Sequence, residues 1–273
     1  VSEPNAGVDN SGRVFVYDIS NPKGASLLQE LVQTGGNPGC RFGTSMSAKD
    51  TYLFVGAPEC GEDEGRVYAF RNPGNGYQQI HIIQPPETGT FEFGESISWS
   101  GSRLIVGAPG THAGIETEVG AVFVFKFGGE FEQRLDPPEI LSGRRFGAAV
   151  SLRQQRIVIG SPRDDYQGWE SGSVTSWKRN NGYWAMQEEF RAAAGEAKEE
   201  FGACLDQRQG ILVVGNSAEG LENNTGGSVY AYQWSSNGWV PTLNPKTMPI
   251  MVQWNELEND PALLAAGFGN SLD

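Results

Sequence analysis

Histidine and cysteine, which supply many catalytic and metal-binding groups, are scarce in this sequence. Its 273 residues include two histidines, His81 and His112, and three cysteines. The sequence has no Gly-x-Ser-x-Gly nucleophile motif, no Cys-x-x-Cys pair and no Gly-x-x-x-x-Gly-Lys phosphate loop. The 33 acidic residues leave many carboxylate pairs possible, but no pattern singles one out. We therefore expect no catalytic residue, metal or cofactor, and predict that the protein is not an enzyme.

Positive charge and long apolar runs are also in short supply. The chain has 20 Lys and Arg against 33 Asp and Glu, a formal net charge of −13 and a pI near 4.7. This balance disfavours nucleic acids and anionic membrane surfaces, which attract clustered cations. The sequence contains no run of 18 apolar residues, so we expect no membrane-spanning segment. Solubility alone accounts for the acidity, so the charge does not identify a partner.

One phrase is abundant. "FGESISWSGSRLIVGAPG" begins at Phe93, and similar phrases begin at Phe42, Phe146 and Phe201. A fifth Phe-Gly, at Phe268, lies close to the end of the sequence. Successive starts are 51, 53, 55 and 67 residues apart, the last interval carrying an insertion. A period of this length indicates a repeat architecture.

Each repeat contains the pattern of four short strands. Two strands lie between Phe-Gly and the Gly-Ala-Pro-like step, and a loop leads to a third strand, "GRVYAF", "GAVFVF", "GSVTSW" or "GSVYAY". A turn and a fourth strand, opened by an aromatic residue, complete the repeat. We predict an all-β fold, a β-propeller of four-stranded antiparallel blades, forming a single domain over 1–273. Small Gly and Ala suit close packing near the propeller axis, and the Phe of Phe-Gly would fill the space between neighbouring sheets.

The two ends of the sequence hold partial repeats. Residues 1–18 align with 55–70, so the chain is expected to begin at the end of strand two and to stop in strand one. We interpret it as a processed or incomplete segment of a longer polypeptide. The two partial repeats could share one blade, giving five blades, or could belong to a larger ring.

Phe-Gly followed by Gly-Ala-Pro resembles the FG-GAP repeat, which forms the β-propeller head of integrin α subunits and occurs in many secreted proteins. The resemblance covers essentially the whole chain and implies a propeller, most often with seven blades; it does not specify a function. Several blades of that family carry an Asp-x-Asp-x-Asp-Gly calcium loop between strands one and two. The corresponding turns here, such as "SAKDTY" and "SLRQQR", lack that pattern, so we do not expect those calcium sites.

The cysteines indicate a cellular compartment. Cys40 precedes strand one of its repeat and Cys60 follows strand two, and antiparallel pairing brings these ends together. We predict a Cys40–Cys60 disulfide, hence an extracellular, cell-surface or oxidising lumenal location, and a buried free thiol at Cys204. Asn223, in "NNT", is a candidate glycosylation site.

Two segments favour helix by composition. "MQEEFRAAAGEAKEEF" (186–201) is rich in helix formers, but the repeat pattern requires a strand at its start, and we follow the repeat. "NDPALLAAG" (259–267) carries helix-start and helix-stop residues and predicts one helical turn.

The loop after strand two varies most between repeats, and in a propeller these loops share one face. A rigid scaffold that presents variable loops is typical of a binding protein. We predict that this face binds a partner, with "DDYQGWE" (164–170) at its centre. The candidate residues are Glu62, Asp63, Glu64, Glu116, Glu118, Asp164, Asp165, Tyr166, Trp169 and Glu222.

The leading hypothesis is a non-enzymatic module of a secreted or lumenal protein that binds another protein or a subunit of a larger assembly. A carbohydrate-binding propeller is the first alternative, because loop Trp and Tyr can stack on sugar rings. An accessory propeller domain of a larger enzyme is the second. Trp169 could instead fold back over its own loop.

Overall fold

The computed structural model describes residues 1–7, 9–20, 24–34, 38–192, 197–216, 228–236 and 238–242. These residues form strands, turns and loops, with no helix among them and hence none that could cross a membrane. The predicted all-β fold is confirmed. The expected helical turn at 259–267 and the Phe-Gly at Phe268 lie outside this part of the chain, and a single domain over 1–273 stays a prediction.

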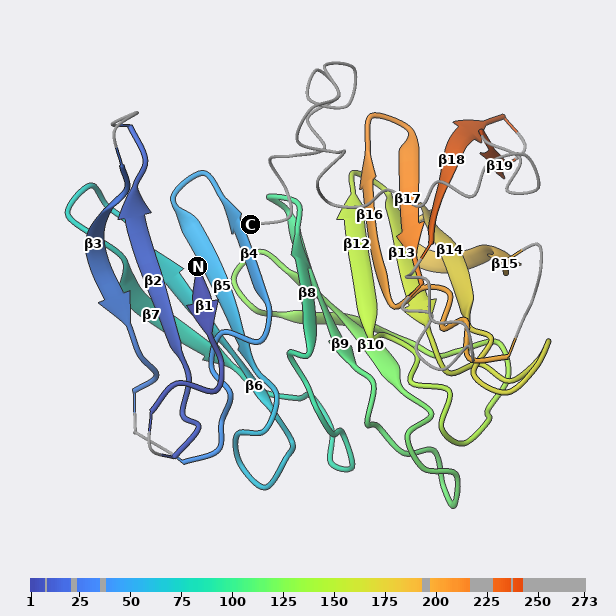
Figure 1. Cartoon of the computed structure of the whole chain (residues 1–273), viewed down its shortest axis with the longest axis horizontal. Helices are drawn as coiled ribbons and strands as arrows, with labels where there is room; N and C mark the ends of the chain where they lie inside the picture. The colour runs from blue at the N-terminus through green and yellow to red at the C-terminus, as the bar shows by residue number, and fades with distance from the viewer. Residues whose placement is uncertain are drawn as a thin grey trace.

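The strands form five antiparallel sheets, which Figure 1 shows side by side like propeller blades. Sheet 1 has three strands: β1 (Ser2–Glu3), β2 (Arg13–Asp18) and β3 (Ser26–Leu31). Sheet 2 comprises β4 (Met46–Lys49), β5 (Tyr52–Ala57), β6 (Arg66–Arg71) and β7 (Gln78–Ile83). Sheet 3 comprises β8 (Ser96–Trp99), β9 (Arg103–Ala108), β10 (Ala121–Lys126) and β11 (Phe131–Leu135).

The remaining two sheets follow the same order. Sheet 4 comprises β12 (Ala149–Arg153), β13 (Arg156–Ser161), β14 (Ser173–Asn180) and β15 (Tyr183–Phe190). Sheet 5 comprises β16 (Cys204–Arg208), β17 (Ile211–Gly215), β18 (Val229–Ser235) and β19 (Gly238–Pro241). β15 confirms the strand that the repeat pattern predicted against helix propensity. Sheet 1 supplies strands two to four of a repeat, as the alignment of residues 1–18 predicted.

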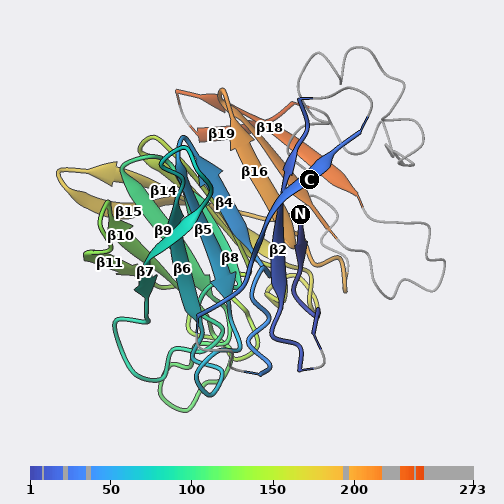
Figure 2. The ribbon, with the colours of Figure 1, turned by 90° about the vertical axis from the view of Figure 1, so that its left-hand side faces the viewer.

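The first strands of neighbouring sheets contact one another: β4 packs beside β8, β8 beside β12 and β12 beside β16. Figure 2 shows strands one to four of sheets 2 and 3 running outward from this inner row to β7 and β11. The pairing of strands three and four shifts register in sheets 1 to 4, for example between Val124 and Phe125. Such irregularities increase local twist, which suits blades that fan around an axis.

Glycine in the repeated phrase permits close contact between sheets. A Cβ atom at Gly56 would lie 2.0 Å from the carbonyl oxygen of Gly94, and one at Gly107 would lie 2.0 Å from that of Gly147. The Gly of each Gly-Ala-Pro therefore faces the Gly of the next Phe-Gly. At Gly65, which precedes the third strand, a Cβ atom would lie 2.2 Å from the Phe93 carbonyl oxygen, and the positive φ of this residue favours glycine as well. No other residue fits these positions without moving the backbone.

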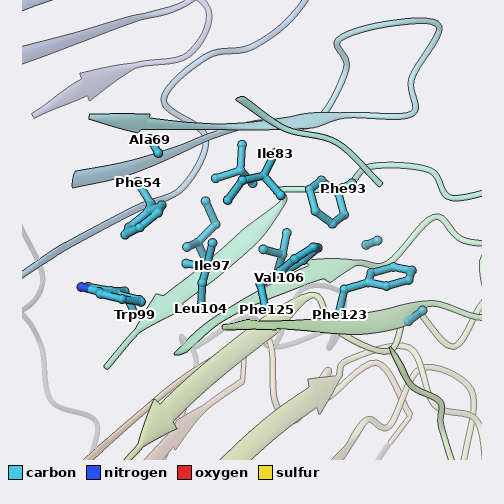
Figure 3. Packing of buried hydrophobic residues seen from close by; sticks show 13 residues of the cluster. Phe54, Ala69, Ile83, Phe93, Ile97, Trp99, Leu104, Val106, Phe123 and Phe125 are labelled. Atoms are coloured by element: carbon cyan, nitrogen blue, oxygen red, sulfur yellow. The ribbon is translucent and has the colours of Figure 1, made fainter. Parts of the chain in front are cut away.

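The Phe of each Phe-Gly fills the space between sheets, as predicted. The four described ones are fully buried: Phe42, Phe93, Phe146 and Phe201. Figure 3 shows Phe93 in a cluster with Phe54, Trp99, Phe123 and other side chains from sheets 2 and 3. Burial of one such ring stabilises the fold by roughly 1.5–3 kcal/mol. The thiol of Cys204 is free, as predicted, but the prediction that it is buried is wrong, because Cys204 is exposed.

Candidate functional site: the loop end of the propeller

The loops after strand two lie at one end of the sheets, which we call the loop end. Figure 1 shows the connections β5–β6 and β9–β10 at its lower edge. Because the strands are antiparallel, the segments that precede each Phe-Gly reach the same end. The loop after β17 contains Glu222 and Asn223, which lie outside the described residues, so their predicted roles stay predictions.

Backbone hydrogen bonds hold each loop against the next repeat. The amide of Phe93 donates to the Glu64 carbonyl at 3.1 Å, that of Phe146 to Val119 at 3.0 Å and that of Phe201 to Ser171 at 3.1 Å. The variable loops are therefore anchored at their C-terminal ends by the Phe residues that pack between the sheets.

A second contact, which we call the staple, joins the residue two positions before Phe-Gly to the loop after strand two. In sheet 2 it is the Cys40–Cys60 disulfide, which confirms the predicted pairing. Both cysteines are fully buried. The bridge encloses the sheet's first two strands and fixes the start of the β5–β6 loop.

Sheets 3 and 5 form this contact with other groups. In sheet 3, the Phe91 amide donates to Thr111 Oγ1 at 3.4 Å, and the Phe91 ring lies 4.8 Å from the His112 ring between centroids. In sheet 5, Glu199 holds the equivalent position and accepts a hydrogen bond from Asn216 Nδ2 at 3.1 Å.

In sheet 4 the staple is a buried ion-pair network. Arg144 Nη2 lies 2.9 Å from Asp164 Oδ2, and both side chains are almost completely buried. Arg144 also pairs with Glu189 on β15, and Arg191 Nη2 lies 3.5 Å from Asp164 Oδ2 and 3.2 Å from Glu189 Oε2. Two cations and two carboxylates thus compensate one another's charge, which a buried ion needs.

Asp164 was expected among the exposed docking residues, and that expectation is wrong. Its carboxylate faces Arg144 inside the protein because the loop folds over it, and its Oδ1 accepts the Tyr166 amide at 3.1 Å. Its carbonyl accepts the Gly172 amide at 3.0 Å and the Ser171 hydroxyl at 3.0 Å. Asp164 therefore shapes the β13–β14 loop instead of contacting a partner.

The two aromatic residues of that loop are exposed. Tyr166 is 65% exposed and Trp169 is 58% exposed. The Arg191 guanidinium lies 4.2 Å from the Tyr166 ring centre, and Lys198 Nζ lies 4.7 Å from that of Trp169. A cation near each ring restricts its motion while leaving much of its surface open to a partner. Trp169 does not fold back to bury itself.

The remaining acidic candidates are spread over three loops. Glu62, Asp63 and Glu64 are exposed on the β5–β6 loop, and Asp165 is exposed beside Tyr166. Glu62 and Asp63 have positive φ angles of 62° and 66°, so the loop turns sharply there. These residues share the loop end, and no direct contact joins the carboxylates of different loops among the described interactions.

A charged residue directly precedes each of the four described Phe-Gly pairs. Glu92 pairs with Arg145 Nη2 at 2.7 Å, and Arg41 pairs with Glu59 at 3.0 Å. Burial raises the pKa of the Glu95 carboxyl, and the negative charge of Glu92 adds to this, although Arg41 and Arg145 oppose it. Among the described residues no three His, Cys, Asp or Glu side chains gather as a metal site.

Sequence reasoning missed Arg144, Arg191 and Lys198, which hold the aromatic loop. A signal for Arg144 was present: it occupies the position of Cys40, and Asp164 occupies that of Cys60. Superimposing the repeats could have identified the pair. The ring contacts of Arg191 and Lys198 have no such counterpart in the described loops of the other repeats.

Comparisons with known proteins agree with the fold. A family model described as the FG-GAP repeat matches residues 130–174, which include Phe146-Gly147 and Gly160-Ser161-Pro162. No curated protein matches the chain by sequence.

Among solved structures, the chain is similar to a putative 6-phosphogluconolactonase from Bacteroides uniformis, with a TM-score of 0.54 and 8% identity. The likeness covers 80% of this chain and 59% of that one, and at this identity it concerns the fold alone. The resemblance predicted from Phe-Gly and Gly-Ala-Pro is confirmed: the chain carries an FG-GAP repeat within a propeller-like series of antiparallel sheets.

Proposed function

We propose that this protein is a non-enzymatic interaction module that binds another protein, or a subunit of a larger assembly, through its loop end. The observation that carries the proposal is the β13–β14 loop, where exposed Tyr166 and Trp169 stand on a backbone fixed by the buried Arg144–Asp164 pair. An aromatic side chain held in one position loses little conformational entropy on binding. Tyr and Trp are also the residues most often found to dominate binding energy at interfaces.

The exposed carboxylates of the same end have a separate role in this proposal. Glu62, Asp63, Glu64 and Asp165 would steer a basic partner towards the loops and add little to the lifetime of the complex. Glu116 and Glu118 would contribute in the same way.

The Cys40–Cys60 disulfide supports a location outside the cytosol. Disulfides persist in extracellular and lumenal compartments and are rare in the reducing cytosol. We therefore place the proposed interaction at a cell surface, in the extracellular space or in an oxidising lumen.

Carbohydrate binding is the second candidate, favoured by the same two exposed rings, which could stack on a sugar. The lactonase description belongs to the similar structure; for this chain, an accessory propeller of a larger enzyme remains the third candidate. The comparison gives no residue of this chain a catalytic role.

Partner capture tests the proposal directly. The protein, immobilised on beads, is exposed to the extracellular fraction of its source organism and compared with a Tyr166→Ser/Trp169→Ser variant. Tyr183→Ser is the matched control, because Tyr183 is 74% exposed at the start of β15, at the opposite end of the sheet.

We expect one or more proteins to be retained by the wild type and the control and lost from the double variant. Retention by all three would place the interface elsewhere. A defined glycan panel is screened in parallel. Binding of a glycan that depends on Trp169 would favour the hypothesis of carbohydrate binding instead.

A further inference from the structure

Among the described residues, the β9–β10 loop presents the most exposed apolar side chain of the loop end. Ile115 is 93% exposed at the tip of a two-residue hairpin. The Ala113 amide donates to the Glu116 carbonyl at 2.9 Å, and the Glu116 amide donates back at 3.2 Å. Gly114 has a φ of 65° and Ile115 does not have positive φ, as in a type II′ turn. The hairpin therefore fixes Ile115 at its apex.

The hairpin is braced by the segment that leads into β12. The Thr117 amide donates to Ser142 Oγ at 3.1 Å, the Gly143 amide donates to the Thr117 carbonyl at 2.9 Å, and Ser142 Oγ donates to Glu116. Isolated exposed apolar residues are common on protein surfaces; this one is held at the tip of a hairpin that a second segment braces.

The bracing segment adds two further apolar side chains. Ile140 is 47% exposed and Leu141 is 39% exposed, directly before Ser142. The three aliphatic residues thus come from two segments joined by hydrogen bonds. We call Ile115, Ile140 and Leu141 the aliphatic anchor.

Carboxylates border the aliphatic anchor, and the nearby cations are already paired. Glu139 is exposed, and neither it nor Glu116 forms a salt bridge with a described residue. Arg144 is buried against Asp164, and Arg145 pairs with Glu92 at 2.7 Å and more loosely with Glu118 at 3.6 Å. An apolar tip with an excess of negative charge around it remains.

We propose that the aliphatic anchor inserts into an apolar pocket of a partner protein whose rim carries lysine and arginine side chains. A second copy of this chain would bring a border of the same charge, and an anionic membrane would repel the carboxylates. The inference rests on the proposed docking role of the loop end and adds a contact in sheet 3 to the aromatic one in sheet 4.

A set of cyclodextrins provides a chemically defined probe. β-Cyclodextrin has an apolar cavity that accepts aliphatic side chains, and its amino and sulfated derivatives surround the same cavity with positive or negative charge. Titrations of the intact protein are followed by the methyl NMR signals of its isoleucines and leucines. Ile115→Ser identifies the Ile115 signal, and Ile80→Ser is the matched control, since Ile80 is 53% exposed on β7.

We expect the Ile115 methyl to shift most and the amino derivative to bind about fivefold more tightly than the neutral one at low salt, with the sulfated one weakest. Ile115→Ser should abolish this binding, and Ile80→Ser should leave it unchanged. Glu118→Lys/Glu139→Lys should remove the preference for the amino derivative and keep binding to the neutral one.

Equal affinity for all three cyclodextrins, or binding that survives Ile115→Ser, would overturn the proposal. Binding to phosphatidylcholine vesicles that is lost in Ile115→Ser would overturn it in favour of a membrane. Its failure is distinguishable from failure of the proposed function, because partner capture there is compared with Tyr166 and Trp169 variants, whereas the cyclodextrin titrations are compared with Ile115→Ser.

Discussion

Sheets 2 and 4 join the same two points of the repeat by different chemistry. Cys40 and Cys60 form a disulfide across a separation of 20 residues. Arg144 and Asp164, at the equivalent positions and the same separation, form a buried ion pair at 2.9 Å. In both cases the contact fixes the loop after strand two against the segment that leads into Phe-Gly.

The difference shows that the fold requires a connection at this point and leaves its chemistry open. A disulfide acts largely on the unfolded chain and needs no polar neighbours. An ion pair must be compensated in the folded state, which explains why sheet 4 also carries Glu189 and Arg191 around Asp164. The two loops should therefore respond differently to reductant and to charge removal.

The largest effect is expected from removal of one charge in sheet 4. Asp164→Ala leaves Arg144 buried beside fewer carboxylates, and loss of one partner from a buried pair costs about 3–5 kcal/mol. Urea unfolding monitored by circular dichroism measures the change in unfolding free energy. Asp165→Ala is the control, because Asp165 is exposed and should change stability by less than about 1 kcal/mol. Similar costs for the two variants would contradict the role assigned to Asp164.

The disulfide should contribute somewhat less. Replacement of Cys40 and Cys60 by Ala is expected to lower the unfolding free energy by about 2–4 kcal/mol. Unfolding is measured with and without a thiol reductant strong enough to open the bridge. The reductant should destabilise the wild type and leave the double variant unaffected. If it destabilised both equally, the bridge would not be the element that distinguishes sheet 2.

A pH series tests a second ionic contact of sheet 4, the one that joins it to sheet 3. Glu132 on β11 pairs with Arg103 at 2.5 Å and with Arg179 on β14 at 2.6 Å. Burial alone would raise the pKa of Glu132, but hydrogen bonds from Arg103 and Arg179 outweigh it and hold the pKa below its usual 4.5.

A carboxyl with a lowered folded-state pKa adds stability above its unfolded-state pKa and loses it as the pH falls through the folded value. Glu132→Gln should therefore cost about 1–3 kcal/mol at pH 7, and the cost should shrink progressively below pH 4.5. Thermal unfolding of both proteins across this pH range measures it. A pH-independent difference would mean that the charge of Glu132 is not what joins sheets 3 and 4.

The smallest effect is expected in sheet 3, where the ring of Phe91, at the staple position, contacts the ring of His112, the residue after Thr111. His112 is exposed, so His112→Ala should cost at most about 0.5–1.5 kcal/mol, the contribution of one aromatic pair. The same urea titration measures it. A loss as large as that of Asp164→Ala would show that the aromatic contact anchors its loop as firmly as the ion pair does.

The sequence predicts the fold well because the constraints repeat. Phe93 and its equivalents must fill the space between sheets, and Gly56 must admit the backbone of Gly94, so Phe and Gly recur at these positions in sheets 2 to 5. The Cys40–Cys60 bridge was also predictable. A cysteine forms a disulfide only with another cysteine, and antiparallel pairing brings the start of strand one close to the end of strand two.

The candidate site was less predictable, because a charged residue has many possible partners. Asp164 and Asp165 are adjacent in sequence, yet one is buried and the other exposed, and only the fold of the loop over Arg144 decides between them. Cys204 is exposed for a similar reason, since its burial depends on neighbouring elements and not on its own type. The exposure of Ile115 follows from a two-residue turn that apolar patterning does not reveal.

The most direct test of the docking surface is the dissociation rate of the captured partner from immobilised wild type, Trp169→Ala and Tyr183→Ala. If Trp169 is an anchor contributing about 2 kcal/mol, its removal should accelerate dissociation roughly 30-fold and change association little. Tyr183→Ala should dissociate like the wild type. Unchanged dissociation from Trp169→Ala would contradict the account and direct attention to another face of the propeller.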